Sequence, residues 1–317
     1  MSYGAQIKFG GARQTSTGSG QAATAAGSFH HLALISEDVG LDKDEIVSAN
    51  LTGRFEEGAV YDGTNRITGT IETEMTPKSA GFLLGMCFGF PTPVTSGSLK
   101  TLTYIPRTQD YSATFVNDPL TIYKQFTDAA SAEHYFDCQV GQFDFMFSQG
   151  QLLKTRAQIV GGSRVATGIG SLNLTLDTGD LSLGTLWDAT SVSYGGVALG
   201  AASEITVSVN ENIEPLYTLN GTLSPYKYTR TGFRQVTVNG TMYFDTRSAY
   251  NDFISSTQRR LIISAQARKT QIQSGYYASL EIDIPQLRLS QFKPAANGPG
   301  EVSVSFTGRG VVDPSSN

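Results

Sequence analysis

The sequence has little charge and few cysteines for its length. Only 16% of its 317 residues are Asp, Glu, Lys or Arg, and the net charge is -5. That balance offers no basic field that could hold nucleic acid by neutralising phosphates. The two cysteines, Cys87 and Cys138, are too few for a disulfide framework in a chain this long, so we expect buried free thiols.

Long apolar segments are also missing. No apolar run approaches the roughly 20 residues of a membrane-spanning helix. The first 20 residues are rich in Gly, Ser, Thr and Gln and lack the apolar centre of a signal peptide. We therefore expect no membrane association.

Motifs that carry catalysis are scarce as well. There is no Gly-x-Ser-x-Gly elbow and no Walker loop, and His30, His31 and His134 supply a His-based triad or a zinc site poorly. Glu72 and Glu74 lie on one predicted strand face and could form the paired carboxylates of a glycosidase. A solvated strand face explains them more simply, so we expect no enzymatic activity, no cofactor and no metal site.

Glycine and aromatic residues are abundant. The chain has 34 Gly, 17 Phe and 14 Tyr, and many segments alternate between apolar and polar residues. A period of two is typical of strands that bury one face. The sequence therefore predicts an all-β protein with short flanking helices.

One stretch, residues 66–85, combines a strand, a cap and a short helix. Its first ten residues alternate, and Thr76-Pro77 then predicts an N-cap followed by the first turn of a helix. Gly85 or Gly89 is expected to end that helix.

The same unit returns at residues 234–254, aligned on Gly69-Thr70 and Gly240-Thr241. The flanking segments recur in order, so we predict two tandem β-sandwich or barrel domains. The expected boundaries are a flexible N-terminal arm (1–28), a first β-domain (29–162), a Gly/Ser/Leu-rich junction (163–202), a second β-domain (203–312) and a C-terminal tail (313–317).

Two long predicted strands change their alternation part-way. In residues 135–147 the parity shifts around Gly141, and in residues 276–289 it shifts at Pro285. Such a shift predicts a β-bulge, which adds one residue to a strand and bends it.

In each half, one long loop with mixed charge and aromatic residues precedes the repeated unit. The two loops span residues 51–65 and 216–232, and loops of this length in a compact β-protein are commonly functional. We predict that they contact another chain, through Arg54, Phe55, Glu56, Glu57, Tyr61, Tyr217, Tyr226 and Tyr228. The alternative is a two-domain carbohydrate-binding module, because Tyr-rich loops also suit sugar stacking.

Residues 35–85 resemble the first half of the tail tube proteins of long-tailed bacteriophages. The resemblance lies in an acidic strand end, a charged loop around Arg54–Tyr61, and Gly69-Thr70-Ile71-Glu72 followed by a helix. Residues 135–161 resemble the paired closing strands of that family. The resemblance implies a β-sandwich or barrel with a flanking helix, and a structural virion protein rather than an enzyme.

The resemblance also implies rings that stack into a hollow tube through which DNA is ejected, with transient, non-specific passage of DNA. Three chains with two domains each would give a pseudo-six-fold ring, and a hexamer is the alternative. Other tail proteins would be partners, and the protein would assemble in the host cytoplasm and reside in the virion tail. The loops would then make inter-ring contacts, and the polar parity of the inner strands nominates lumen-facing residues: Glu72, Glu74, Asp144, Glu281 and Asp283.

Overall fold

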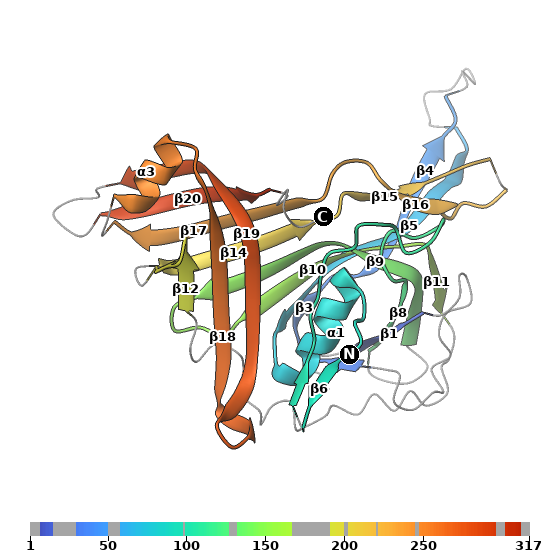
Figure 1. Ribbon diagram of the computed structural model, residues 1–317. Coiled ribbons are helices and arrows are strands. Elements are labelled where there is room, and N and C mark those ends of the chain that lie inside the picture. Colours follow the sequence, from blue (N-terminus) through green and yellow to red (C-terminus); the bar gives the residue numbers. More distant parts are fainter. Residues whose placement is uncertain are drawn as a thin grey trace.

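The computed structural model describes residues 7–14, 30–49, 58–97, 99–126, 132–166, 191–199, 202–219, 221–244, 247–295 and 302–311. In this part of the chain, strands dominate and two short helices flank them, α1 (Pro77–Phe88) and α3 (Ser248–Ile254) (Figure 1). The predicted all-β fold class is thereby confirmed.

A large antiparallel sheet organises the described residues. Its main hydrogen-bonded path follows the order β13-β12-β18-β19-β20-β17-β14-β9-β10-β5-β3. In chain order these strands are β3 (Leu34–Glu37), β5 (Val60–Glu74), β9 (Ala132–Ser148), β10 (Lys154–Gly161), β12 (Ser191–Tyr194), β13 (Val197–Ala198), β14 (Ala202–Asn210), β17 (Gln235–Tyr243), β18 (Gln258–Gln273), β19 (Tyr276–Ala295) and β20 (Ser303–Gly310).

Shorter strands extend this sheet or stand beside it. The strands that join it off the main path are β1 (Lys8–Arg13), β2 (His30–Leu32), β4 (Gly40–Val47), β8 (Leu120–Gln125) and β11 (Ser163–Ala166). Separate hairpins are formed by β6 (Val94–Ser96) with β7 (Leu99–Thr101), and by β15 (Ile213–Leu216) with β16 (Lys227–Arg230).

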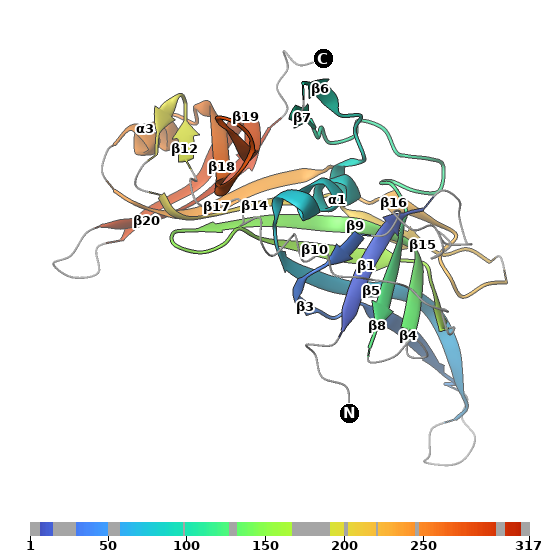
Figure 2. The ribbon, with the colours of Figure 1, turned by 90° about the horizontal axis from the view of Figure 1, so that it is seen from below.

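The central strands share one apolar face and one polar face. Strand pairing places a row of mostly apolar residues in register across seven strands: Thr73, Thr155, Phe145, Val207, Val238, Gly308 and Leu289. Figure 2 shows α1, α3 and the β18–β19 hairpin on the same side of these strands. Residues of these elements, such as Phe82 and Leu261, belong to the same buried cluster as Phe145 and Val207, so this side is the core.

Helix α1 begins and ends where the local sequence predicts. The Thr76 hydroxyl accepts a hydrogen bond from the Ser79 backbone N–H at 3.1 Å, and the Ser79 hydroxyl accepts one from the Thr76 backbone at 3.0 Å. Pro77 occupies the first turn, and Gly89 caps the C-terminus at φ 89°. These caps satisfy backbone groups that the helix itself leaves unpaired.

The two halves of the chain repeat one order of pairings. In the first half β5 pairs with β10, β10 with β9, β9 with β8, and β8 with β1. In the second half β17 pairs with β20, β20 with β19, β19 with β18, and β18 with β12. A helix follows β5 and another follows soon after β17, as predicted.

The irregularities of the strands correspond as well. Gly141 is skipped in the β9–β10 register, and Ser290 is skipped in the β19–β20 register. The bulge predicted at Gly141 is therefore confirmed. A second irregularity skips residues 136–137 between β8 and β9, and residues 285–286 between β18 and β19, which includes the shift predicted at Pro285. Each irregularity in the second half lies 149 residues after its counterpart in the first half. The same spacing aligns Val140-Gly141-Gln142-Phe143 with Leu289-Ser290-Gln291-Phe292.

The two halves are joined through one strand pair. Residues 142–148 of β9 pair antiparallel with residues 210–204 of β14, so the sheet continues from one predicted domain into the next. One buried cluster also contains residues of both halves. The domain boundaries stay a prediction.

The expected flexible arm over residues 1–28 is wrong for its middle part. Residues 8–13 form β1, which lies between β2 and β8, and Phe9 and Ala12 are 1% and 0% exposed. Composition alone missed this strand because two glycines among six residues leave too little alternation to recognise. The tail at residues 313–317 and most of the junction (167–190) lie outside the described residues.

Candidate assembly surfaces

The polar face of the central sheet carries rows of charged and polar side chains. One row crosses seven strands in register: Glu72, Arg156, Asp144, Ser208, Thr237, Arg309 and Arg288. A neighbouring row contains Glu74, Lys154, Met146, Thr206, Asn239, Thr307 and Gln291. Acidic and basic residues are therefore mixed on this face.

Arg156 is neutralised within its own row. Its Nε and Nη2 donate to Asp144 Oδ2 at 2.9 and 2.8 Å, and Glu72 lies directly opposite on the other neighbouring strand. The Asp144 side chain is only 2% exposed because the guanidinium covers it. A guanidinium held by a carboxylate in this way has less capacity left to bind a phosphate.

The structure brings together three of the five predicted lumen residues. Glu72, Glu74 and Asp144 lie on the polar face of the central sheet. Glu281 and Asp283 instead lie on the exposed face of the β18–β19 hairpin, where Asp283 pairs with Arg260 at 2.6 Å. The bend near Pro285 separates these two groups of carboxylates.

The two predicted contact loops meet at one edge of the molecule. The β15–β16 hairpin lies beside the middle of the β4–β5 hairpin, whose end projects further outward (Figure 1). Asn65 connects them: its backbone N–H donates to Leu223 O at 2.9 Å, its carbonyl accepts from Tyr217 Oη at 3.2 Å, and its side-chain oxygen accepts from Ser224 Oγ at 3.1 Å. We refer to β4–β5 residues 46–61 and loop residues 216–226, as far as they are described, as the hairpin lobe.

The hairpin lobe exposes several large apolar side chains. Those more than a third exposed are Ile46, Val47, Val60, Tyr61, Leu216, Leu219, Leu223 and Tyr226. Exposed apolar clusters of this kind commonly mark an interaction surface.

The predicted contact residues are distributed unevenly over this surface. Tyr61 and Tyr226 are 60% and 57% exposed, whereas Tyr217 is half-buried by its hydrogen bond to Asn65. Tyr228 is 5% exposed and stacks on Phe115 with ring centroids 5.8 Å apart, so it has no free face in the isolated chain. Arg54, Phe55, Glu56 and Glu57 lie outside the described residues.

A buried carboxylate that the sequence did not single out connects the two halves. Glu211 is 0% exposed and pairs with Arg230 at 2.5 Å and Arg234 at 2.6 Å. Its backbone N–H donates to Gly141 O at 2.8 Å, and Arg234 also donates to Arg107 O at 2.8 Å. Glu211 thus satisfies two guanidinium groups while its backbone holds the first half.

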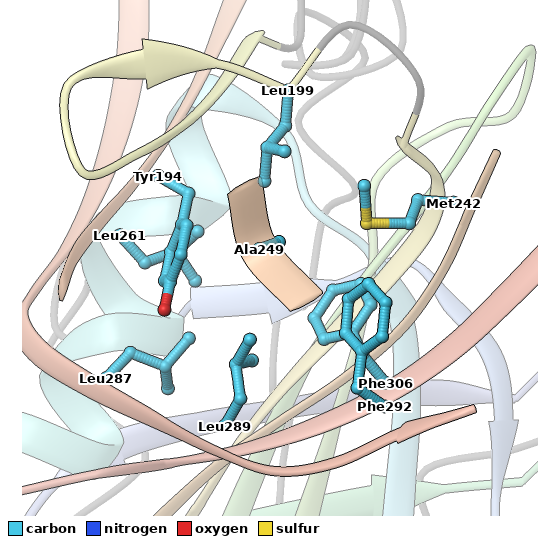
Figure 3. Close-up of a pocket in the computed structure, with 9 residues that line it drawn as sticks. All are labelled: Tyr194, Leu199, Met242, Ala249, Leu261, Leu287, Leu289, Phe292 and Phe306. Atoms are coloured by element: carbon cyan, nitrogen blue, oxygen red, sulfur yellow. The ribbon is translucent and has the colours of Figure 1, made fainter. Parts of the chain in front are cut away.

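A small apolar pocket lies in the core of the second half (Figure 3). Its lining is Tyr194, Leu199, Met242, Ala249, Leu261, Leu287, Leu289, Phe292 and Phe306. The Tyr194 hydroxyl is buried without a hydrogen-bond partner, and burial raises its pKa to about 12. With one phenol and no convergent polar groups, this pocket has the character of core packing and not of a catalytic site.

Among the described residues, no group of three or more His, Cys, Asp or Glu side chains is placed to hold a metal ion. Over the same residues, no helix combines the length and apolarity needed to cross a bilayer. Cys87 and Cys138 are both buried free thiols, as predicted.

A comparison with protein families identifies the family to which this chain belongs. A family model described as phage tail tube protein matches residues 4–310. The chain belongs to the phage tail tube protein family. The resemblance seen in residues 35–85 is thereby confirmed, and membership makes the chain a structural component of the virion tail that assembles into a tube with other tail proteins. No curated protein matches the chain.

Proposed function

We propose that the chain forms closed rings that stack into the tail tube, and that DNA leaves the virion through their lumen. The observation that carries this proposal is the two-faced central sheet. Its apolar face packs on the core, and its polar face spans both halves without a covering helix among the described residues. A sheet of this kind can line a channel with one face while its own protein covers the other.

We further propose that the two halves are copies of one unit and that three chains make a pseudo-six-fold ring. The matched order of pairings and the matched bulges support a duplication. A ring of six equivalent units would then need three chains, with a hexamer as the alternative.

The experiment is electron microscopy of the purified full-length chain, with rotational averaging of end views. We expect hollow rings or rods with six lobes that differ in a three-fold pattern. Six identical lobes would indicate a hexamer. Protein that stays monomeric at high concentration, with and without other tail proteins, would contradict the ring proposal, and retention on glycan would then favour a carbohydrate-binding module.

The same grids test the hairpin lobe as the contact between rings. Tyr61→Asp combined with Tyr226→Asp places two charges on its exposed apolar surface. We expect single rings that no longer stack, because a charge buried in an apolar contact is costly. Rods of normal length would assign ring stacking to another surface.

We propose that the lumen is the polar face with Glu72, Glu74 and Asp144. Glu72→Lys with Glu74→Lys should leave tube length unchanged and slow DNA ejection, because each new cation can hold a phosphate. Ejection is measured by dye exclusion in phage that carry the variant, and the delay should shrink as salt rises. The matched control is Glu281→Lys with Asp283→Lys on the β18–β19 hairpin, for which we expect unchanged ejection; the reverse pattern would place the lumen on that face.

A further inference from the structure

Two strand edges in opposite halves of the sheet lack a partner strand among the described residues. Within the described residues, β3 and β4 pair only with β5, so their outer edge has no partner strand. In the second half, β18 pairs with β19 only as far as Arg288, and β19 beyond that residue pairs with β20 alone. An open edge presents unpaired backbone N–H and C=O groups to another strand.

The junction between the two halves shows how such edges can be joined. Gln142, Phe143 and Asp144 of β9 lie opposite Asn210, Val209 and Ser208 of β14. The bulge correspondence places Gln291, Phe292 and Lys293 of β19 on those three β9 residues. The open part of β19 is thus the second-half counterpart of the strand segment that receives β14.

The other open edge is the first-half counterpart of β14. Ile159 pairs with Val140 and Gly69, as Gly308 pairs with Leu289 and Val238. Gly69 is thus the structural counterpart of Val238. The sequence alignment paired Gly69 with Gly240, two residues later in β17, and this shift of two keeps the residue on the same face of the strand. We then count residues along β5 and β17 from this match. The β5 partners Leu41 and Asp42 correspond to the β17 partners Val209 and Asn210. In the first half, β3 and β4 therefore present the edge that β14 presents inside the molecule.

We infer that the open edge of β19 pairs antiparallel with the β3–β4 edge of a second copy of this chain, in the register of the β9–β14 junction. Gln291 then lies opposite Asp42, Phe292 opposite Leu41, and Lys293 opposite Gly40. This inference rests on the proposed ring, and it identifies the strands and the register that close it.

The chemistry of the two edges is complementary in this register. On the core side, Phe292, which is 5% exposed, meets Leu41, which is half-buried in the isolated chain. On the polar side, Lys293 would lie diagonally between Asp38 and Asp42. The Asp42 carboxylate also pairs with Arg66 at 3.1 Å, and the Asp38 carboxylate accepts a hydrogen bond from the Thr70 backbone N–H. Lys293 has no ion pair within the described chain, and Arg309 and Arg288 add positive charge on the same face nearby.

The test is disulfide formation in the assembled full-length protein carrying Gln291→Cys and Asp42→Cys. Opposite residues of paired strands lie within disulfide distance. On a non-reducing gel we therefore expect most of the protein to move from the monomer band to a ladder of disulfide-linked oligomers. The two native cysteines are 1% and 0% exposed and do not compete.

Two control variants fix the interpretation. Gln142→Cys with Asn210→Cys, the equivalent pair inside the chain, should close within one molecule and give no ladder. Gln291→Cys with Lys43→Cys is shifted by one residue, which turns the second side chain to the other face of the strand, and should remain monomeric under oxidation.

The outcomes separate this inference from the proposed function. Rings or tubes without a ladder, while the internal pair closes, would overturn the edge pairing and leave the function standing, as would equal ladders from the shifted pair. If the unmodified chain forms no rings, both the edge pairing and the proposed function are contradicted. If the cysteine variants fail to fold, hydrogen exchange on the unmodified chain decides: residues 38–42 and 291–293 should gain protection on assembly, and unchanged exchange would contradict the pairing.

Discussion

His134 shows how a single residue can make this protein sensitive to acid. Its ring lies against Tyr123 with centroids 4.1 Å apart, and its Nε2 is buried without a hydrogen-bond partner. Burial lowers the pKa of His134 from 6.5 to about 4. The unfolded chain therefore binds a proton between these pH values that the folded chain does not, and stability falls as pH drops from 6.5 toward 4.

We predict that His134→Phe reduces this loss of stability. The aromatic contact is kept, and on the order of 2 kcal/mol of acid sensitivity should disappear, allowing for the partial exposure of the ring. The measurement is the urea midpoint at pH 7.5 and pH 4.5 for both proteins. An equal loss in both would show that His134 does not titrate as its burial indicates; His31, whose pKa burial also lowers, would account for any sensitivity that remains.

Among the elements, β5 depends on one glycine where β3 passes into β4. Gly69 has φ +153°, and a Cβ atom there would lie 2.4 Å from Val39 Cα. Val39 is 1% exposed, so the neighbouring chain has little room to move. Only a residue without a side chain lets the β3–β4 edge approach β5 this closely.

We predict that Gly69→Ala destabilises the protein by about 2–3 kcal/mol, in line with overpacking of a well-packed site. The β3–β4 edge that we infer to pair with a second copy should shift as well, so formation of the proposed ring should weaken. Denaturant unfolding measures the first effect and electron microscopy the second.

Gly150→Asn is the matched control for this substitution. Gly150 has φ +72°, and no atom lies within 4 Å of the place that a Cβ atom would take. Asn tolerates that backbone conformation, so we expect little change in stability. A similar loss in both variants would argue against a special role for Gly69.

At the scale of the whole molecule, the two halves are one mechanical unit. The β9–β14 pairing continues the sheet. The carboxylate of Glu211 holds Arg230 and Arg234, which in turn bond Asp110 and the Arg107 carbonyl of the first half. In the proposed ring, a continuous sheet through both halves would keep the polar face of one chain in one piece.

We predict that Glu211→Ala costs about 3–5 kcal/mol, because two guanidinium groups lose a fully buried partner. Calorimetry should show one unfolding transition in the unmodified chain and two, or one broadened transition, in the variant. Asp283→Asn removes an exposed ion pair with Arg260 and should leave the unfolding temperature almost unchanged. A loss of similar size for both would mean that Glu211 does not hold the halves together.

The sequence by itself determined the local features of this protein. Alternation predicted long strands such as β5 and β9, though not β1. Thr76-Pro77 and Gly89 predicted the ends of α1, and the parity shifts predicted the irregularities at Gly141 and Pro285. These features depend on neighbouring residues and on the period of the backbone, so a single chain can display them. The family resemblance was also readable because its signals lie within short stretches.

The tertiary structure alone decided which residues are free to act. It buried Tyr228 against Phe115, covered Asp144 with Arg156, and placed β1 inside a sheet. Over the described residues, it also left the outer edges of β3–β4 and β19 open. Each of these outcomes depends on which strands become neighbours, and that choice is made by contacts between residues far apart in the chain, which alternation along one strand does not encode.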